Sequence, residues 1–161
     1  TQSRSSAASD VYKRQVMKHL GLSCQSLVAS PALARTLPAG ADVSQISQLP
    51  TLALGTEQRE CQWRLDGPDG ARQNVPFTPR LVTDDMLALK QATLRGVGVA
   101  ALPLMMIRDE LDAGTLVPVG APWYPEPGAV HAVFPSRRGL LPAVRELLDF
   151  MNAEYLSLIH I

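Results

Sequence analysis

The sequence lacks an excess of either charge and any long apolar run. Its 15 Lys and Arg balance 15 Asp and Glu, so the formal net charge at pH 7 is zero and the isoelectric point is about 6.8. The chain therefore carries no general electrostatic attraction for nucleic acid. No run approaches the roughly 18 apolar residues that a membrane helix requires, and residues 1–15 lack the apolar core of a secretion signal. These absences favour a cytoplasmic protein with no membrane contact.

Cysteine and histidine are equally scarce. Cys24 and Cys61 form no CxxC pair, which fits a reducing compartment, although a disulfide between them stays open. His19, His131 and His160 are isolated, and no HxxxH or Cys/His cluster of a metal site occurs. The sequence also has no GxSxG elbow. It therefore predicts no metal, no cofactor and no enzymatic activity.

Apolar residues, in contrast, are plentiful enough for a packed core. They make up 46% of the 161 residues, and the mean hydropathy of +0.03 argues against disorder. A chain of this length can form one ordinary domain or two small lobes.

The stretch RLVTDDMLALKQATLRGVGVAALP, residues 80–103, contains the strongest local signals. Residues 81–82 suit a short buried strand, and Thr83, Asp84 and Asp85 are residue types that cap a helix start. Good helix formers follow as far as residue 94. The pattern predicts a strand followed directly by a helix.

The second half of this stretch predicts the end of that helix and another strand. Gly96 fits the left-handed position just past a helix end. Residues 97–102 are apolar apart from Gly98, as expected of a strand covered on both faces. Pro103 stops the strand and can open the next helix. The resulting βαβ unit places the first turn of its helix at the carboxyl end of a strand, where ligands bind in open α/β sheets.

Strands alternate with helices along the rest of the chain. Asp42 and Gln45 form a capping box, and the final helix should stop near Asn152. We expect strands at 25–30, 52–54, 61–65, 71–77, 115–119 and 129–134, and helices at 31–37, 43–49, 104–112 and from about 141. This pattern indicates an α/β fold with two lobes, joined by crossover strands near Val28 and Val133.

Both ends of the chain look foreign to this pattern. DVYKRQ and LSLIHI look like translated sequencing-adapter fragments, so we expect residues 1–15 and 156–161 to be a non-native leader and tail. A genuine disordered leader and tail is the alternative.

An ordered series of segments resembles the effector-binding domain of LysR-type transcriptional regulators. The resemblance covers roughly residues 20–152 and includes Trp63. The matching segments are SLVASPALA, SQISQLPTLALG, LVTDDMLALKQATLRGVGVAALP, GTLVPV and VHAVFPSRRGLLPAVRELLDFM. No single segment is decisive, but their order is specific.

The resemblance implies a type 2 periplasmic-binding-protein-like fold, with one complete Rossmann-like lobe plus a partial second lobe. Residues 16–27 would be a remnant of lobe one, residues 28–128 would be lobe two, and residues 129–155 would be the crossover strand and closing helix of lobe one.

The same resemblance implies a sensor function. A small-molecule effector of unknown identity would bind between the lobes. The full-length protein would be a homodimer or tetramer and would contact DNA only through an N-terminal helix-turn-helix domain, which is missing from this fragment.

Thr83 and Asp84 are the first candidate effector contacts, since the family places the start of this helix at the cleft. Free N–H groups and the positive helix end suit an anion. The two acidic side chains of Asp84 and Asp85 oppose an anion, so they cap the helix or meet a cationic group instead.

Ser30, Gly55, Thr56 and Pro103 are further candidates at expected strand ends. For Ser30 the alternative role is a helix cap, and for Gly55 and Thr56 it is an ordinary turn. Pro103 could line an apolar wall or simply pack in the core.

Two other classes of protein use the same two-lobed scaffold. A solute-binding protein of a transport system would need a secretion signal, and an enzyme such as a deaminase or dehydratase would need a clustered acid/base set. GVGVAA, residues 96–101, mimics a dinucleotide fingerprint, but it follows a helix instead of opening one, so no nucleotide is predicted.

Overall fold

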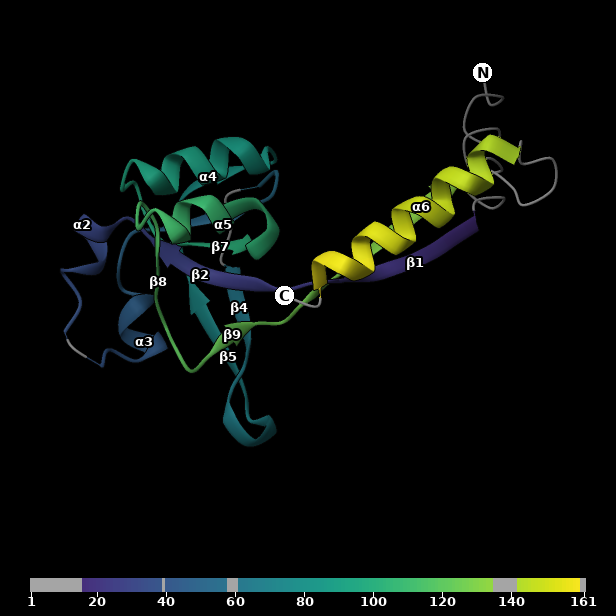
Figure 1. Ribbon diagram of the computed structural model, residues 1–161. Coiled ribbons are helices and arrows are strands. Elements are labelled where there is room, and N and C mark those ends of the chain that lie inside the picture. Colours follow the sequence, from purple (N-terminus) through teal and green to yellow (C-terminus); the bar gives the residue numbers. More distant parts are fainter. Residues whose placement is uncertain (1–15, 39, 58–60, 135–141, 160–161) are drawn as a thin grey trace, which may run out of the picture. The chain divides into compact units, whose positions relative to one another are not determined.

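The computed structural model describes residues 16–38, 40–57, 61–134 and 142–159 (Figure 1). The chain divides into two compact units. The larger unit is Cys24–Pro127, and the smaller unit combines the residues before Cys24 with those after Pro127. The chain thus crosses between the units twice. Val28, the expected first crossover, lies inside a strand of the larger unit.

The smaller unit contains a two-stranded antiparallel sheet and one helix. Strand β1 (Val16–Ser23) pairs with β10 (Gly128–Phe134), and α6 (Pro142–Ile159) packs against β1. The strand register places the exposed rings of His19 and His131 edge to face, with centroids 5.2 Å apart.

The end of α6 corrects a sequence prediction. We expected a stop near Asn152, but the helix continues to Ile159. No Gly or Pro follows Asn152, and Ala153, Glu154 and Leu156 are good helix formers, so nothing in the sequence ends the helix there. The turn expected at residues 136–139 lies outside the described residues.

Five strands form the sheet at the centre of the larger unit. β3 and β6 are parallel, β2 is antiparallel to both β7 and β8, and a parallel bridge between Thr51 and Val99 joins the two groups. The strands are β2 (Gln25–Ala29), β3 (Thr51–Leu54), β6 (Pro79–Thr83), β7 (Ala100–Pro103) and β8 (Val117–Pro118).

Four helices connect these strands, and their local signals act as predicted. Ser30 Oγ accepts a hydrogen bond from Leu33 N at 3.4 Å, and Asp42 and Gln45 form the capping box. The helices are α2 (Pro31–Ala34), α3 (Val43–Ile46), α4 (Met86–Leu94) and α5 (Leu104–Asp112). The helix expected at 43–49 ends at Ile46 because its last turn tightens: Gln48 N and Leu49 N donate to carbonyls three residues back.

The predicted strand–helix–strand unit is confirmed as β6, α4 and β7. β6 is not the buried strand expected at residues 81–82, because Leu81 is exposed and Val82 is only partly buried. Gly96 adopts the left-handed conformation, with φ of +74°. Val97 N donates to Ala92 O at 3.0 Å, so this residue completes the helix cap. β7 therefore begins at Ala100 and not at Val97, as expected from the apolar run.

A smaller antiparallel sheet extends from the same unit. It has the order β5-β4-β9 and includes the edge strand predicted at 71–77. Its elements are β4 (Cys61–Asp66), the 3-10 turn η1 (Pro68–Gly70), β5 (Arg72–Phe77) and β9 (Tyr124–Pro125).

Both faces of the central sheet are covered by side chains. α4 and α5 pack on one face with Val28, Leu52 and Leu102, while α3 and the β4–β5 hairpin pack with Leu27 and Ala53 on the other. Each fully buried side chain of this size contributes about 1.5–3 kcal/mol to folding. The apolar runs of the sequence therefore reflect a sheet buried on both sides, as predicted.

Candidate functional site

The strand register gathers several chain segments at one edge of the central sheet. β3 and β6 end together, with Leu54 opposite Thr83. β7 runs parallel to β3, and its last residue, Pro103, pairs with Gln25 at the start of β2. All four residues therefore lie at the carboxyl edge of the parallel strands, which is the edge that binds ligands in open α/β sheets.

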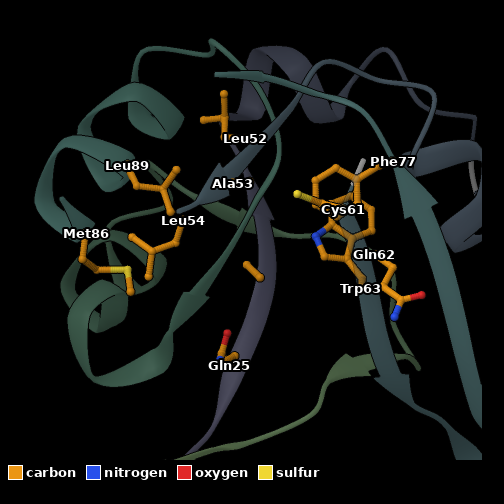
Figure 2. A pocket seen from close by; sticks show the side chains of 11 residues that line it. Gln25, Leu52, Ala53, Leu54, Cys61, Gln62, Trp63, Phe77, Met86 and Leu89 are labelled. Carbon is orange, nitrogen blue, oxygen red and sulfur yellow. The ribbon is translucent and has the colours of Figure 1, made fainter. Parts of the chain in front are cut away.

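A cavity of about 520 Å³ lies at this edge, entirely within the larger unit. Its volume falls in the range of small-molecule sites. Figure 2 shows aliphatic and thioether side chains of β3 and α4 on one side and an aromatic pair with Cys61 and Gln62 on the other. The lining residues are Gln25, Leu52, Ala53, Leu54, Cys61, Gln62, Trp63, Phe77, Met86, Leu89 and Ala101.

The aromatic wall is fixed by burial and ring contact. Trp63 and Phe77 are 5% and 8% exposed, and their ring centroids are 4.4 Å apart. The opposite wall is more open, because Leu54 is 50% exposed. Among the lining residues, the polar side chains are two amides and a thiol, and none is formally charged at neutral pH.

The first turn of α4 lies beside the cavity and already has its hydrogen-bond acceptors. Asp85 Oδ1 accepts from Leu87 N at 2.8 Å and from Ala88 N at 3.2 Å. Thr83 Oγ1 accepts from Asp85 N at 3.1 Å. Asp85 is therefore the helix cap, and the N–H groups that would attract an anion are largely occupied.

Four of the predicted site residues lie around the rim. Thr83 is half-buried and its hydroxyl retains a proton to donate, whereas Asp84 is exposed. Gly55 N donates to Thr83 O at 2.9 Å, which holds Gly55 beside Thr83, and Thr56 follows, exposed. None of the four lines the cavity, and neither does Pro103, although its pairing partner Gln25 does.

Ser30 lies at the opposite edge of the sheet, which corrects the sequence prediction. β2 is antiparallel to β7, so its carboxyl end lies at the amino end of β7. A Cβ atom on Gly96 would lie 3.0 Å from Ser30 Oγ, which places Ser30 beside the C-terminal end of α4. Ser30 caps α2 and is 6% exposed.

A second hollow, of about 600 Å³, is lined by Ser30 and its neighbours at this opposite edge. Arg35 and Arg95 contribute to its wall and are both exposed. It shares no residue with the cavity beside Thr83.

Sequence reasoning missed the walls of the main cavity. Trp63 was identified only as part of the family resemblance, and Phe77 and Met86 only as members of a strand and a helix. Their positions depend on how the β4–β5 hairpin packs against the sheet, and local patterns do not encode that contact. The alternation of buried and exposed residues in β4 was the one available signal.

The described part of the chain offers no other evident chemistry. It contains no group of three or more His, Cys, Asp or Glu residues that could hold a metal ion. Within the same residues, every helix is too short or too polar to cross a membrane.

The sequence and the structure of this chain are similar to those of one family of known proteins. The family model described as LysR substrate binding domain matches residues 15–155. The HTH-type transcriptional regulator PtxR of Pseudomonas aeruginosa is 27% identical over 118 residues, which cover 66% of this chain and 38% of PtxR. The LysR family substrate-binding-domain protein YagP of Escherichia coli K12 is 26% identical over 113 residues, covering 63% of this chain and 82% of YagP.

Solved structures show the same fold. The regulatory domain of AphB from Vibrio vulnificus, in its C227S variant, superposes with a TM-score of 0.70 at 20% identity, covering 88% of this chain and 69% of that one. The regulatory domain of CrgA from Neisseria meningitidis gives a TM-score of 0.71 at 19% identity, with the same coverage of 88% and 69%. The present chain thus spans little more than a third of PtxR, but most of an isolated regulatory domain.

Proposed function

The chain belongs to the family of LysR substrate-binding domains, and on that premise we propose that it is the effector-sensing part of a bacterial LysR-type transcriptional regulator. The observation that carries this proposal is the family match over residues 15–155, together with the type 2 periplasmic-binding-protein-like fold shared with regulatory domains of such proteins. PtxR is a transcriptional regulator and YagP contains a LysR family substrate-binding domain, which favours sensing over transport or catalysis.

The effector would bind at the carboxyl edge of the larger unit. The cavity there has the size of a small-molecule site, and the Thr83 hydroxyl at its rim can donate a hydrogen bond. Gly55, Thr56, Asp84 and Pro103 lie at the same edge and complete the proposed contact region.

DNA binding would belong to a separate domain of the full-length protein. PtxR is an HTH-type regulator, and the family match here covers only the substrate-binding domain. The full-length protein would be a cytoplasmic homodimer or tetramer. Effector binding would shift the population of its conformations and thereby change its affinity for DNA.

Selective recovery of genomic DNA tests the regulatory function. Full-length protein, expressed from its complete gene, should retain a small set of DNA fragments, while the 161-residue chain should retain none above background. The comparison is read by sequencing the retained DNA. Absence of selective retention by the full-length protein would contradict the proposal.

Thr83→Ala tests the contact at the rim. Titration of the complete effector-binding domain, expressed from the full gene, with small carboxylates, amines and alcohols should identify a binder. Loss of one hydrogen bond of about 0.5–1.5 kcal/mol should weaken its affinity by roughly 2- to 10-fold. Thr115→Ala is the matched control, because Thr115 donates to Glu110 O at the end of α5, away from the cavity. Unchanged affinity in Thr83→Ala would remove Thr83 from the site.

A further inference from the structure

We propose that the effector presents an uncharged, ring-sized apolar group to the cavity between Met86 and the Trp63–Phe77 pair. This inference rests on the proposed function, because it takes the cavity as the effector site. It is narrower than that function, because the sequence alone did not decide between an anionic and a cationic effector.

The cavity wall is mostly apolar. Five of its side chains are aliphatic and two are aromatic, and the others are a thioether, a thiol and two amides. None of these residue types carries a formal charge. Burying a carboxylate or an ammonium against such a wall costs several kcal/mol unless a partner of opposite charge is buried with it. An apolar group gains free energy on entering the same space.

Two cations near the cavity, Lys90 and Arg64, already have acidic partners. Lys90 of α4 is 16% exposed, forms an ion pair with Glu110 and donates to Met106 O at 2.7 Å. Arg64, next to Trp63 in the chain, has Glu126 at 4.0 Å. Neither side chain lines the cavity, so neither compensates an anion inside it.

The N-terminal end of α4 does not offer an anion site either. The Asp85 carboxylate accepts hydrogen bonds from the N–H groups of Leu87 and Ala88, and Thr83 accepts from Asp85 N. An incoming carboxylate would have to displace Asp85 and would meet its charge and that of Asp84. The positive end of the α4 dipole therefore already interacts with a carboxylate of the protein itself, that of Asp85.

The shape of the cavity favours a ring. The indole of Trp63 and the phenyl ring of Phe77 form a rigid wall, and Met86 faces them from α4 (Figure 2). Aromatic contacts stabilise a bound ring beyond the burial of its surface, and a thioether sulfur also contacts rings favourably. The amides of Gln25 and Gln62 can pair with a neutral hydroxyl or carbonyl on the ligand.

Two probes that share one ring and differ in charge test the inference. Benzyl alcohol is neutral and benzoate is anionic at neutral pH, and both are titrated into the 161-residue chain by isothermal calorimetry. We expect benzyl alcohol to bind at least about 10-fold more tightly than benzoate, a difference of about 1.4 kcal/mol. Benzoate binding as tightly as benzyl alcohol, or no binding of either probe, would overturn the inference.

A charge placed at the rim locates the binding. Leu54→Lys changes a half-exposed lining residue without emptying the core, and it should raise benzoate affinity by about 10-fold. The matched control is Leu87→Lys, on the neighbouring α4 and 57% exposed but not part of the lining, which should leave both affinities unchanged. Equal effects of the two variants would place the probes elsewhere and overturn the inference.

Failure of this inference can be distinguished from failure of the proposed function. Tight benzoate binding that Thr83→Ala weakens would reject the uncharged class while retaining an effector site at this edge. Failure of the full-length protein to retain DNA would reject the regulator without changing the ranking of the two probes.

Discussion

Asp84 and Asp85 are adjacent acids with different roles in the structure. The Asp85 carboxylate accepts hydrogen bonds from two backbone N–H groups in the first turn of α4, while Asp84 is exposed. The sequence predicted a cap within residues 83–85 but could not choose between them, because each residue type can serve. The backbone geometry makes Asp85 the cap. Its carboxylate therefore occupies the N–H groups that an anion would use.

Asp85→Ala should lower the free energy of unfolding by about 1 kcal/mol, because two N–H groups lose their acceptor. Asp84→Ala, the matched control, should change it by less than about 0.5 kcal/mol as an exposed substitution. Urea unfolding followed by circular dichroism measures both. Equal losses in the two variants would contradict the assignment of the cap.

The Lys90–Glu110 pair joins α4 to α5 and makes stability depend on pH. The hydrogen bond from Lys90 holds the pKa of Glu110 below its ordinary value of 4.5. A carboxyl group whose pKa is lower in the folded state stabilises the fold above the ordinary value, and this contribution disappears as the pH falls through the folded pKa.

Glu110→Gln should therefore flatten the acid side of the stability profile. We expect the difference in unfolding free energy between wild type and variant to shrink as the pH falls below 4.5, since the wild type loses its ion pair there. Urea midpoints across this pH range provide the measurement. The hydrogen bond from Ser44 also lowers the pKa of Asp42. The resulting pH dependence of stability is the same in the wild type and in Glu110→Gln, so it cancels in the difference. A difference independent of pH would contradict the account.

At the scale of elements, β6, α4 and β7 were predictable because their signals are local. Gly96, the acidic cap and the apolar strands each depend on residues within a few positions. The edge on which Ser30 lies was not predictable, because a strand pattern does not reveal whether the strand runs parallel or antiparallel to its neighbour. The stop expected near Asn152 failed because no residue there opposes helix formation.

The junction between β3 and β7 depends on the absence of a side chain at Gly98. A Cβ atom there would lie 2.6 Å from Pro50 O, the same carbonyl that accepts from Val99 N at 2.8 Å. Gly98→Ala should therefore cost about 1–3 kcal/mol of unfolding free energy. Gly55→Ala, where the nearest atom is at an ordinary 3.6 Å, should cost less than about 0.5 kcal/mol. Thermal unfolding compares them, and equal costs would show that the junction tolerates the clash.

At the scale of the whole molecule, the family was predictable from the order of segments, whereas the cavity was not. Trp63 and Met86 are far apart in the chain, and they face one cavity only because the hairpin packs on the sheet. Such tertiary contacts leave no periodic trace in a single sequence.

The larger unit should carry the cavity by itself. All lining residues belong to Cys24–Pro127, as do the buried clusters that support them. A fragment of these residues should unfold cooperatively. Its affinity for benzyl alcohol should lie within about threefold of that of the 161-residue chain, a free-energy difference well below the roughly 1.4 kcal/mol of a tenfold change. Calorimetry on both proteins makes the comparison. A folded fragment without binding would show that residues outside it contribute to the site.

The central claim is that this chain is the sensor of a DNA-binding regulator, and the genomic sequence upstream of its first codon tests that claim most directly. The account predicts an in-frame segment encoding a helix-turn-helix and a linker helix. A secretion signal in that position would contradict it and identify a transport protein instead.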